Sequence, residues 1–212
     1  MSKLKIVAIS DTHNRHSQLE VPDGDILIHA GDITSKGDLR DVRRFNNFLG
    51  DLPHKHKIVI AGNHDFCFER EPQAAQKELT NCIYLQDSEV VIEGIKFYGS
   101  PWQPWFFDWA FNLQRGEEIR RKWELIPSDT DVLITHGPPL NHGDKVSSGS
   151  AVGCEDLLNK IMEVKPRYHI FGHIHEDYGI SKNENTTFIN ASTCTLSYKP
   201  ENPPIVFEYI LS

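Results

Sequence analysis

The stretch KIVAISDTH, residues 5–13, places an aspartate and a histidine just beyond the short apolar run Lys5–Ile9. Similar runs, rich in Val and Ile, recur at Asp25–Ala30, Lys57–Ala61, Asp131–Thr135 and Tyr168–Phe171. Runs of this kind are typical of strands that are buried on both faces of a sheet. We therefore expect these segments to be the central strands of an α/β fold.

Helical patterns and a second set of strands surround these runs. Apolar residues recur at helical spacing over 39–49, ahead of Gly50, and over 157–162, ahead of Pro166. The second set of strands is expected at Glu89–Ile92 and Ile95–Gly99, as a hairpin across Glu93-Gly94, and at Thr187–Asn190 and Ile205–Leu211. The pattern predicts mixed sheets covered by helices.

Length and composition limit the classes of function. The chain has 212 residues, which fits a single domain over 1–212, and its 39% hydrophobic and 25% charged residues are typical of a globular protein. The net charge of -8 disfavours a nucleic-acid polymer as partner. The apolar run near the amino terminus is too short for a signal peptide, and no run approaches membrane-spanning length. We therefore expect a cytoplasmic protein with no membrane partner.

Metal-ligating residue types follow each of the five central runs. They occur in the order DTH, GD, GNHD, HG and GHIH, which supplies Asp11, His13, Asp32, Asn63, His136, His173 and His175. In α/β sheets, functional sites form beyond the carboxyl ends of the strands, so residues far apart in sequence converge there. Taken singly, each residue is better explained as a turn former or a hydrogen-bonded core group. Taken together, they predict one metal site.

The number of donors favours two ions over one. Asp11 and His13 lie on one side of an extended chain, about 6.5 Å apart, and can reach the same ion. The spacing of His173 and His175 serves either one ion or two. The set has two carboxylates, one amide and four imidazoles, which is more donors than one four- to six-coordinate ion would bind. This mixture of oxygen and imidazole donors suits Mn, Fe, Zn or Ni. Two cations would attract a phosphoryl group and activate a hydroxide as the nucleophile.

The five motifs resemble those of the calcineurin-like metallophosphoesterases, and the whole chain is most similar to their metallophosphoesterase-domain-containing (MPPED) branch. The resemblance implies two stacked mixed β-sheets with helices outside, a four-layer αββα sandwich. It implies one divalent ion on Asp11, His13, Asp32 and His175, and a second on Asp32, Asn63, His136 and His173, with manganese favoured. It also implies that His64 contacts phosphate and assists the leaving group, and that Asp65 orients His64.

Other candidate residues have plainer explanations. His29 and His169 are expected to be hydrogen-bonded core groups, and His54 and His56 to be solvated turn residues. The segment YGSPWQPWFFDWAFNL contains the aromatic residues Trp102, Trp105, Phe106, Phe107, Trp109 and Phe111 without helical or strand period. We expect most of these rings to pack in the core or a loop, and one or two to stack on a base or an aryl group.

The resemblance predicts a metal-dependent phosphodiesterase that cleaves nucleotide or cyclic-nucleotide diesters by attack of a metal-bound hydroxide. The alternatives are a phosphomonoesterase or protein phosphatase built on the same centre, and a non-catalytic scaffold such as retromer's metallophosphoesterase-like subunit. The complete set of ligands argues against a scaffold. The motifs do not separate diesters from monoesters, and they leave the oligomeric state open.

Overall fold

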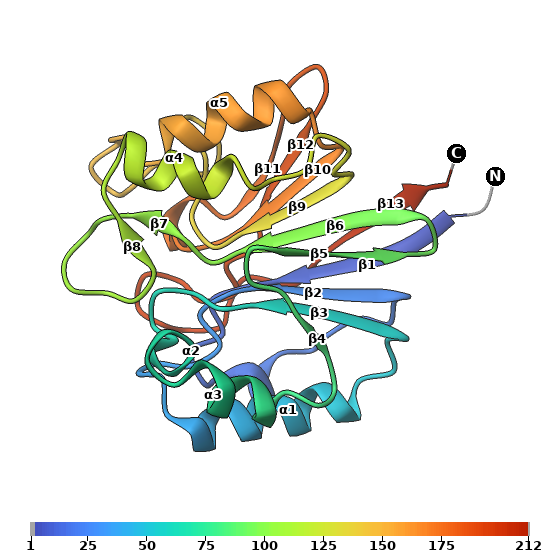
Figure 1. Ribbon diagram of the computed structural model, residues 1–212. Coiled ribbons are helices and arrows are strands. Elements are labelled where there is room, and N and C mark those ends of the chain that lie inside the picture. The colour runs from blue at the N-terminus through green and yellow to red at the C-terminus, as the bar shows by residue number, and fades with distance from the viewer. Residues whose placement is uncertain (1–2, 212) are drawn as a thin grey trace.

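The computed structural model describes residues 3–211, and two sheets stacked face to face form its centre (Figure 1). The first sheet has the order β13-β1-β2-β3-β4, and the second β11-β12-β10-β9-β6-β5. The strands of the first sheet are β1 (Lys3–Ile9), β2 (Ile26–Ala30), β3 (His56–Ile60), β4 (Ile83–Tyr84) and β13 (Ile205–Ile210). Those of the second are β5 (Ser88–Ile92), β6 (Ile95–Ser100), β9 (Val132–Thr135), β10 (Tyr168–Phe171), β11 (Gly179–Lys182) and β12 (Thr187–Asn190).

Helices cover the outer face of each sheet, which completes the predicted αββα sandwich (Figure 1). Beside the first sheet lie α1 (Leu39–Asp51), α2 (Phe66–Arg70) and α3 (Pro72–Glu78), and beside the second lie α4 (Glu117–Trp123) and α5 (Glu155–Val164). The connections contain two 3-10 turns, η1 (His16–Gln18) and η2 (His175–Asp177). They also contain a small ribbon of β7 (Gln103–Pro104) and β8 (Asn112–Leu113). Within residues 3–211, no helix has the length and apolar composition needed to cross a bilayer.

Apolar burial explains this layering. Ile6, Ile28, Ile134 and Ile170, from both sheets, meet in one buried cluster between them, and separate buried clusters lie under the helices of each face. All five predicted central runs form strands, and they are buried on both faces because each sheet has a partner sheet on one side and helices on the other. The hairpin of β5 and β6 is antiparallel as predicted.

Two expectations need correction. Helix α1 runs through Gly50 to Asp51, and the Leu52 amide then bonds to the Leu49 carbonyl, so Gly50 does not end the helix. His54 is not a solvated turn residue, since only 2% of it is exposed. The turn before β3 places its ring against Gly24, and His56 already belongs to β3.

Parallel pairing brings the functional ends of the strands together. β1, β2 and β3 are mutually parallel, and so are β9 and β10, so the residues that follow each set emerge at one edge of its sheet. At this edge a bridge between Ser10, after β1, and Ser192, after β12, joins the two sheets, and a hydrogen bond from the Gly172 amide to the His136 carbonyl extends the pairing of β10 with β9. The five motifs therefore meet between the sheets.

Candidate metal centre

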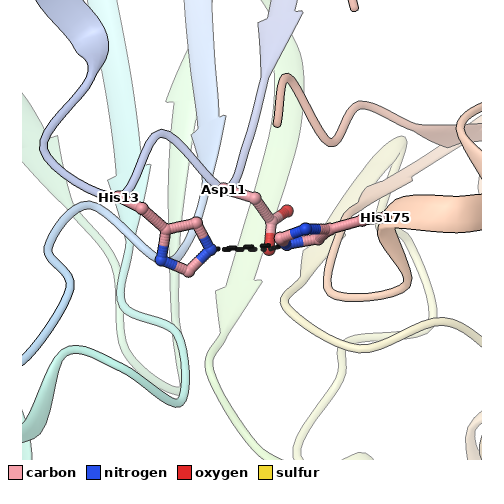
Figure 2. Close-up of side chains that lie close together, drawn as sticks. All are labelled: Asp11, His13 and His175. Atoms are coloured by element: carbon pink, nitrogen blue, oxygen red, sulfur yellow. Dashed lines mark hydrogen bonds and ion pairs between the residues drawn. The ribbon is translucent and has the colours of Figure 1, made fainter. Parts of the chain in front are cut away.

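The first group of donors consists of Asp11, His13 and His175, which approach one another from β1 and from the loop after β10. Figure 2 shows the two imidazole rings on either side of the Asp11 carboxylate. The His13 and His175 Nε2 atoms are 3.3 Å apart, and the His175 Nε2 lies 3.2 Å from Asp11 Oδ1. These three residues can hold one ion between them.

The second group forms around Asn63 from the loop after β3. Asn63 Oδ1 lies 2.8 Å from the His136 Nε2 and 2.9 Å from the His173 Nδ1. His136 is fully buried, and its Nδ1–H donates to the Ala30 carbonyl of the neighbouring sheet, so its Nε2 faces the centre. The structure thus brings the amide and two of the four imidazoles into one cluster.

Asp32 lies between the two groups and turns one carboxylate oxygen toward each. Its Oδ2 is 3.6 Å from the His13 Nε2, and its Oδ1 is 3.4 Å from the His136 Nε2. The His64 amide donates to the same Oδ1 at 2.8 Å, which helps to fix the carboxylate plane. All seven residues expected as ligands are therefore gathered in one place.

Unusual backbone conformations shape these loops. Asp11, His13, Asp32 and His173 have φ angles of 53°, 42°, 57° and 69°. This left-handed region is sparsely populated by residues other than glycine, although Asp, Asn and His enter it more readily, and such outliers cluster at functional sites. Gly172 has a different role: a Cβ at this position would collide with the Asp11 carboxylate and the Ser10 hydroxyl, so only glycine leaves Asp11 in place.

Neighbouring hydrogen bonds orient the donors. The Asp11 carboxylate accepts from the His173 amide at 3.0 Å and from the Ser192 hydroxyl at 3.0 Å. The His175 Nδ1–H donates to the Thr195 carbonyl at 3.0 Å, so its Nε2 points at the centre. Bonds of this kind fix the tautomer and the ring plane of a metal-binding histidine.

Charge is closely balanced inside the site. Burial alone would raise the pKa of the Asp32 carboxyl, but the His136, His13 and His64 imidazoles reverse this and hold the pKa far below its usual range. Burial alone would lower the pKa of His136, yet the Asp32 and Asp11 carboxylates raise it to about 9. The His175 pKa is raised to about 9 by Asp11 against the effect of burial. The two buried carboxylates thus require positive charge beside them.

His64 and Asp65 occupy the loop between β3 and α2. The His64 Nδ1 lies 3.0 Å from the Ser35 carbonyl, so Ser35, not Asp65, orients this ring. The Asp65 carboxylate instead accepts from the amides of Gly62, Ile33 and Thr34, which ties the two ligand-bearing loops together. Burial and the nearby Asp32 charge raise the pKa of Asp65 to about 6.

A cavity of about 460 Å³ opens from the centre, and His64, Asn63 and His173 line its polar end. Trp109 lies beside His64, with ring centroids 4.2 Å apart. Sequence reasoning missed Tyr198, whose ring centroid is 4.8 Å from that of His13 and 5.5 Å from that of His175. No periodicity or motif marks Tyr198, and only the turn after Thr195 brings it to the site.

The model of the calcineurin-like phosphoesterase family matches residues 4–177, which contain all five motifs. The chain belongs to this family. It is 49% identical to human metallophosphoesterase domain-containing protein 1, over 96% of this chain and 70% of the human protein. This similarity places the chain with the metallophosphoesterase-domain-containing (MPPED) proteins of the family, and membership supports hydrolysis of phosphoesters.

More distant comparisons agree with this placement. The Escherichia coli 3',5'-cyclic adenosine monophosphate phosphodiesterase CpdA is 26% identical over 83% of this chain and 63% of its own length. One crystal structure aligns over 99% of this chain and 100% of its own with a TM-score of 0.71, at 17% identity. At that identity the structural match concerns the fold alone.

Proposed function

We propose that this chain is a phosphodiesterase that depends on two divalent metal ions and acts on nucleotide or cyclic-nucleotide diesters. The observation that supports it most strongly is the position of Asp32, whose two carboxylate oxygens face two separate sets of donors. One set is Asp11, His13 and His175 with Asp32, and the other is Asn63, His136 and His173 with Asp32. The distant relation to a cyclic AMP phosphodiesterase supports the diester substrate.

The donor atoms fit divalent cations. Oxygen and imidazole donors without thiolate suit Mn, Fe, Zn or Ni, and we retain manganese as the favoured ion. The His13 and His175 Nε2 atoms face each other, and two buried carboxylates lie beside them. Without an added cation, only protons on the imidazoles can balance these charges. Bound divalent ions would supply Lewis acidity and lower the pKa of a coordinated water.

The protein side chains would then position the substrate and handle the leaving group. His64 lies at the polar end of the cavity, and its Nδ1–H is held by the Ser35 carbonyl. In this orientation the His64 Nε2 faces the site, and when the ring carries a second proton, as imidazolium, Nε2 can donate that proton to the ester oxygen that departs and return to the neutral Nδ1–H form. The Asp65 carboxylate bonds to both loops, and in this way it fixes the loop of Asn63 and His64 against the loop of Asp32.

Metal analysis and a substrate panel test the proposal together. After reconstitution with manganese, elemental analysis should find about two ions per chain, because one ion would leave part of the buried donor set uncompensated. The loaded protein should hydrolyse cyclic AMP and an aryl phosphodiester at least tenfold faster than AMP or an aryl phosphomonoester. A preference for the monoesters would contradict the diester assignment, and a metal content of one or none would contradict the dinuclear centre.

A further inference from the structure

An apolar wall extends the cavity outward from the metal centre. We use this name for Pro104, Trp105, Phe106, Val146, Val152 and Leu196, all of which line the cavity. Three separate connections supply it: Trp105 and Phe106 lie between β7 and β8, Val146 and Val152 lie between β9 and α5, and Leu196 follows β12. The wall and the proposed metal ligands thus share one cavity.

Several large apolar side chains of the wall are exposed to solvent. Phe106 is 57% exposed and Leu196 is 60% exposed, while Trp105 and Val152 also lie among the exposed large hydrophobic residues. A cluster of exposed apolar groups in a concave surface is the usual mark of a binding site. Because this cluster is continuous with His64 and Asn63, its occupant is a group attached to the phosphate.

Hydrogen bonds from two side chains to backbone carbonyls hold the wall in position. The Asn112 side chain donates to the carbonyls of Phe106 and Phe107, at 3.3 and 2.7 Å. On the other side, the Arg115 guanidinium donates to the carbonyls of Val152 and Gly153, at 2.6 and 2.7 Å. A preformed surface loses less conformational entropy when a ligand binds.

The charged residues of the cavity, away from the centre, are already engaged. Arg115 donates to the two carbonyls just described, and the Glu176 carboxylate accepts from the Ser147 amide and hydroxyl, at 3.2 and 3.0 Å. These bonds hold both side chains against the neighbouring backbone, and none of the six residues of the wall itself carries a charge. Burial against this wall is therefore most favourable for an apolar group of the ligand.

We propose that the wall binds a bulky apolar ester group of the substrate, so that the enzyme selects phosphodiesters by the apolar area of the group retained on phosphorus. This inference rests on the phosphodiesterase function proposed above and specifies its substrate class. Each methylene that becomes buried contributes a factor of roughly 4 in affinity. A hexyl ester that lies partly on the wall should therefore exceed a methyl ester by roughly 10- to 100-fold in kcat/KM.

The test compares methyl and hexyl p-nitrophenyl phosphodiesters, which share one leaving group. Wild-type protein should show the 10- to 100-fold preference, and Phe106→Ala and Leu196→Ala should each reduce the ratio of hexyl to methyl kcat/KM roughly 3- to 10-fold. Phe107→Ala is the matched control, since Phe107 is 63% exposed in the same loop but does not line the cavity. Thermal melting should show that all three variants remain folded.

Binding of methylphosphonate and hexylphosphonate to the manganese-loaded protein, measured by calorimetry, tests the wall without turnover. Hexylphosphonate should bind at least tenfold more tightly, and Phe106→Ala should reduce this difference. Equal binding of the two phosphonates, or equal losses in the Phe106 and Phe107 variants, would overturn the inference. If the phosphonates differ as expected but neither diester is hydrolysed, the wall stands and the proposed phosphodiesterase function fails.

Discussion

The strand ends and the aromatic segment Trp102–Phe111 both contribute residues to one cavity but are built differently. Asp11, Asp32 and His136 are buried, follow central strands and are held by hydrogen bonds from both sheets. The aromatic segment crosses a connection that contains only the short ribbon of β7 and β8, and its Trp105 and Phe106 are more than half exposed. Rigid strand ends suit groups that must hold ions, whereas a loop can vary with the substrate.

The largest expected effect comes from replacing Asp32, the strand-end residue that both sets of metal donors share. Asp32→Ala should remove metal from both sets of donors and reduce kcat/KM by at least roughly 10³-fold, because the remaining donors would lose their common carboxylate. His13→Ala should empty only the set of Asp11 and His175 and leave about one ion per chain. Elemental analysis of both variants checks this, and equal metal loss in the two would show that the sets are not separate.

The next effect concerns His64, which lies where the two regions meet. His64→Ala should retain the metal ions but slow turnover roughly 10²- to 10⁴-fold, the usual contribution of a positioned general acid. The defect should shrink for a nitrophenolate leaving group, which departs without protonation. Rates for a series of leaving groups measure this dependence. A defect that is constant across the series would instead assign His64 to phosphate binding.

A third prediction compares tryptophans within the aromatic segment. Trp109 lies beside His64 in the cavity, whereas Trp102 packs on Phe111 and donates from its Nε1 to Asp87 at 2.9 Å. Trp109→Leu should lower kcat/KM for an aryl or nucleoside diester roughly 5- to 150-fold more than for a methyl diester with the same leaving group, the contribution of one stacked ring.

Trp102→Leu is the matched control for this prediction. It should lower the melting temperature and affect both diesters alike, because the Trp102 ring does not line the cavity. If Trp109→Leu also affects both diesters alike while remaining folded, the ring beside His64 is structural.

The smallest expected effect is on the pH dependence of stability, and it concerns His169, a buried histidine outside the metal centre. His169 bonds to Thr135 at 2.8 Å, and burial lowers the pKa of His169 to about 3. The unfolded chain protonates this imidazole near pH 6.5, so the free energy of unfolding falls as the pH drops below 6.5 toward 3. Between pH 6.5 and 5, the free energy of unfolding of His169→Gln should therefore fall by about 1–2 kcal/mol less than that of the wild type.

Urea unfolding of the wild type and of His169→Gln at several pH values measures this slope. The variant is expected to be less stable at pH 7.5, so the readout is the change in stability with pH, not stability itself. Parallel pH profiles for the two proteins would show that His169 does not take up a proton on unfolding.

The structure confirms much of the predicted fold, because apolar runs and the residues that end them are local features. The five central strands follow from apolar runs buried on both faces of the sheets, the β5 and β6 hairpin follows from its turn at Glu93-Gly94, and the αββα layering is the one that the family resemblance implies. His29 and His169 are buried and hydrogen-bonded as expected, to Thr12 and Thr135. In the aromatic segment Phe111 is buried in the core, whereas Trp105, Phe106 and Phe107 lie in the loop and are more than half exposed.

The identity of the metal donors and their places after strands can be read from the chain, since residue type and period are local properties of the sequence. Three relations come from the packed structure: Asp32 turns one oxygen to each donor set, Ser35 and not Asp65 orients His64, and Tyr198 lies at the site. These relations join residues far apart in sequence. They depend on how two sheets stack and how loops turn at positive φ, and no local pattern records such geometry.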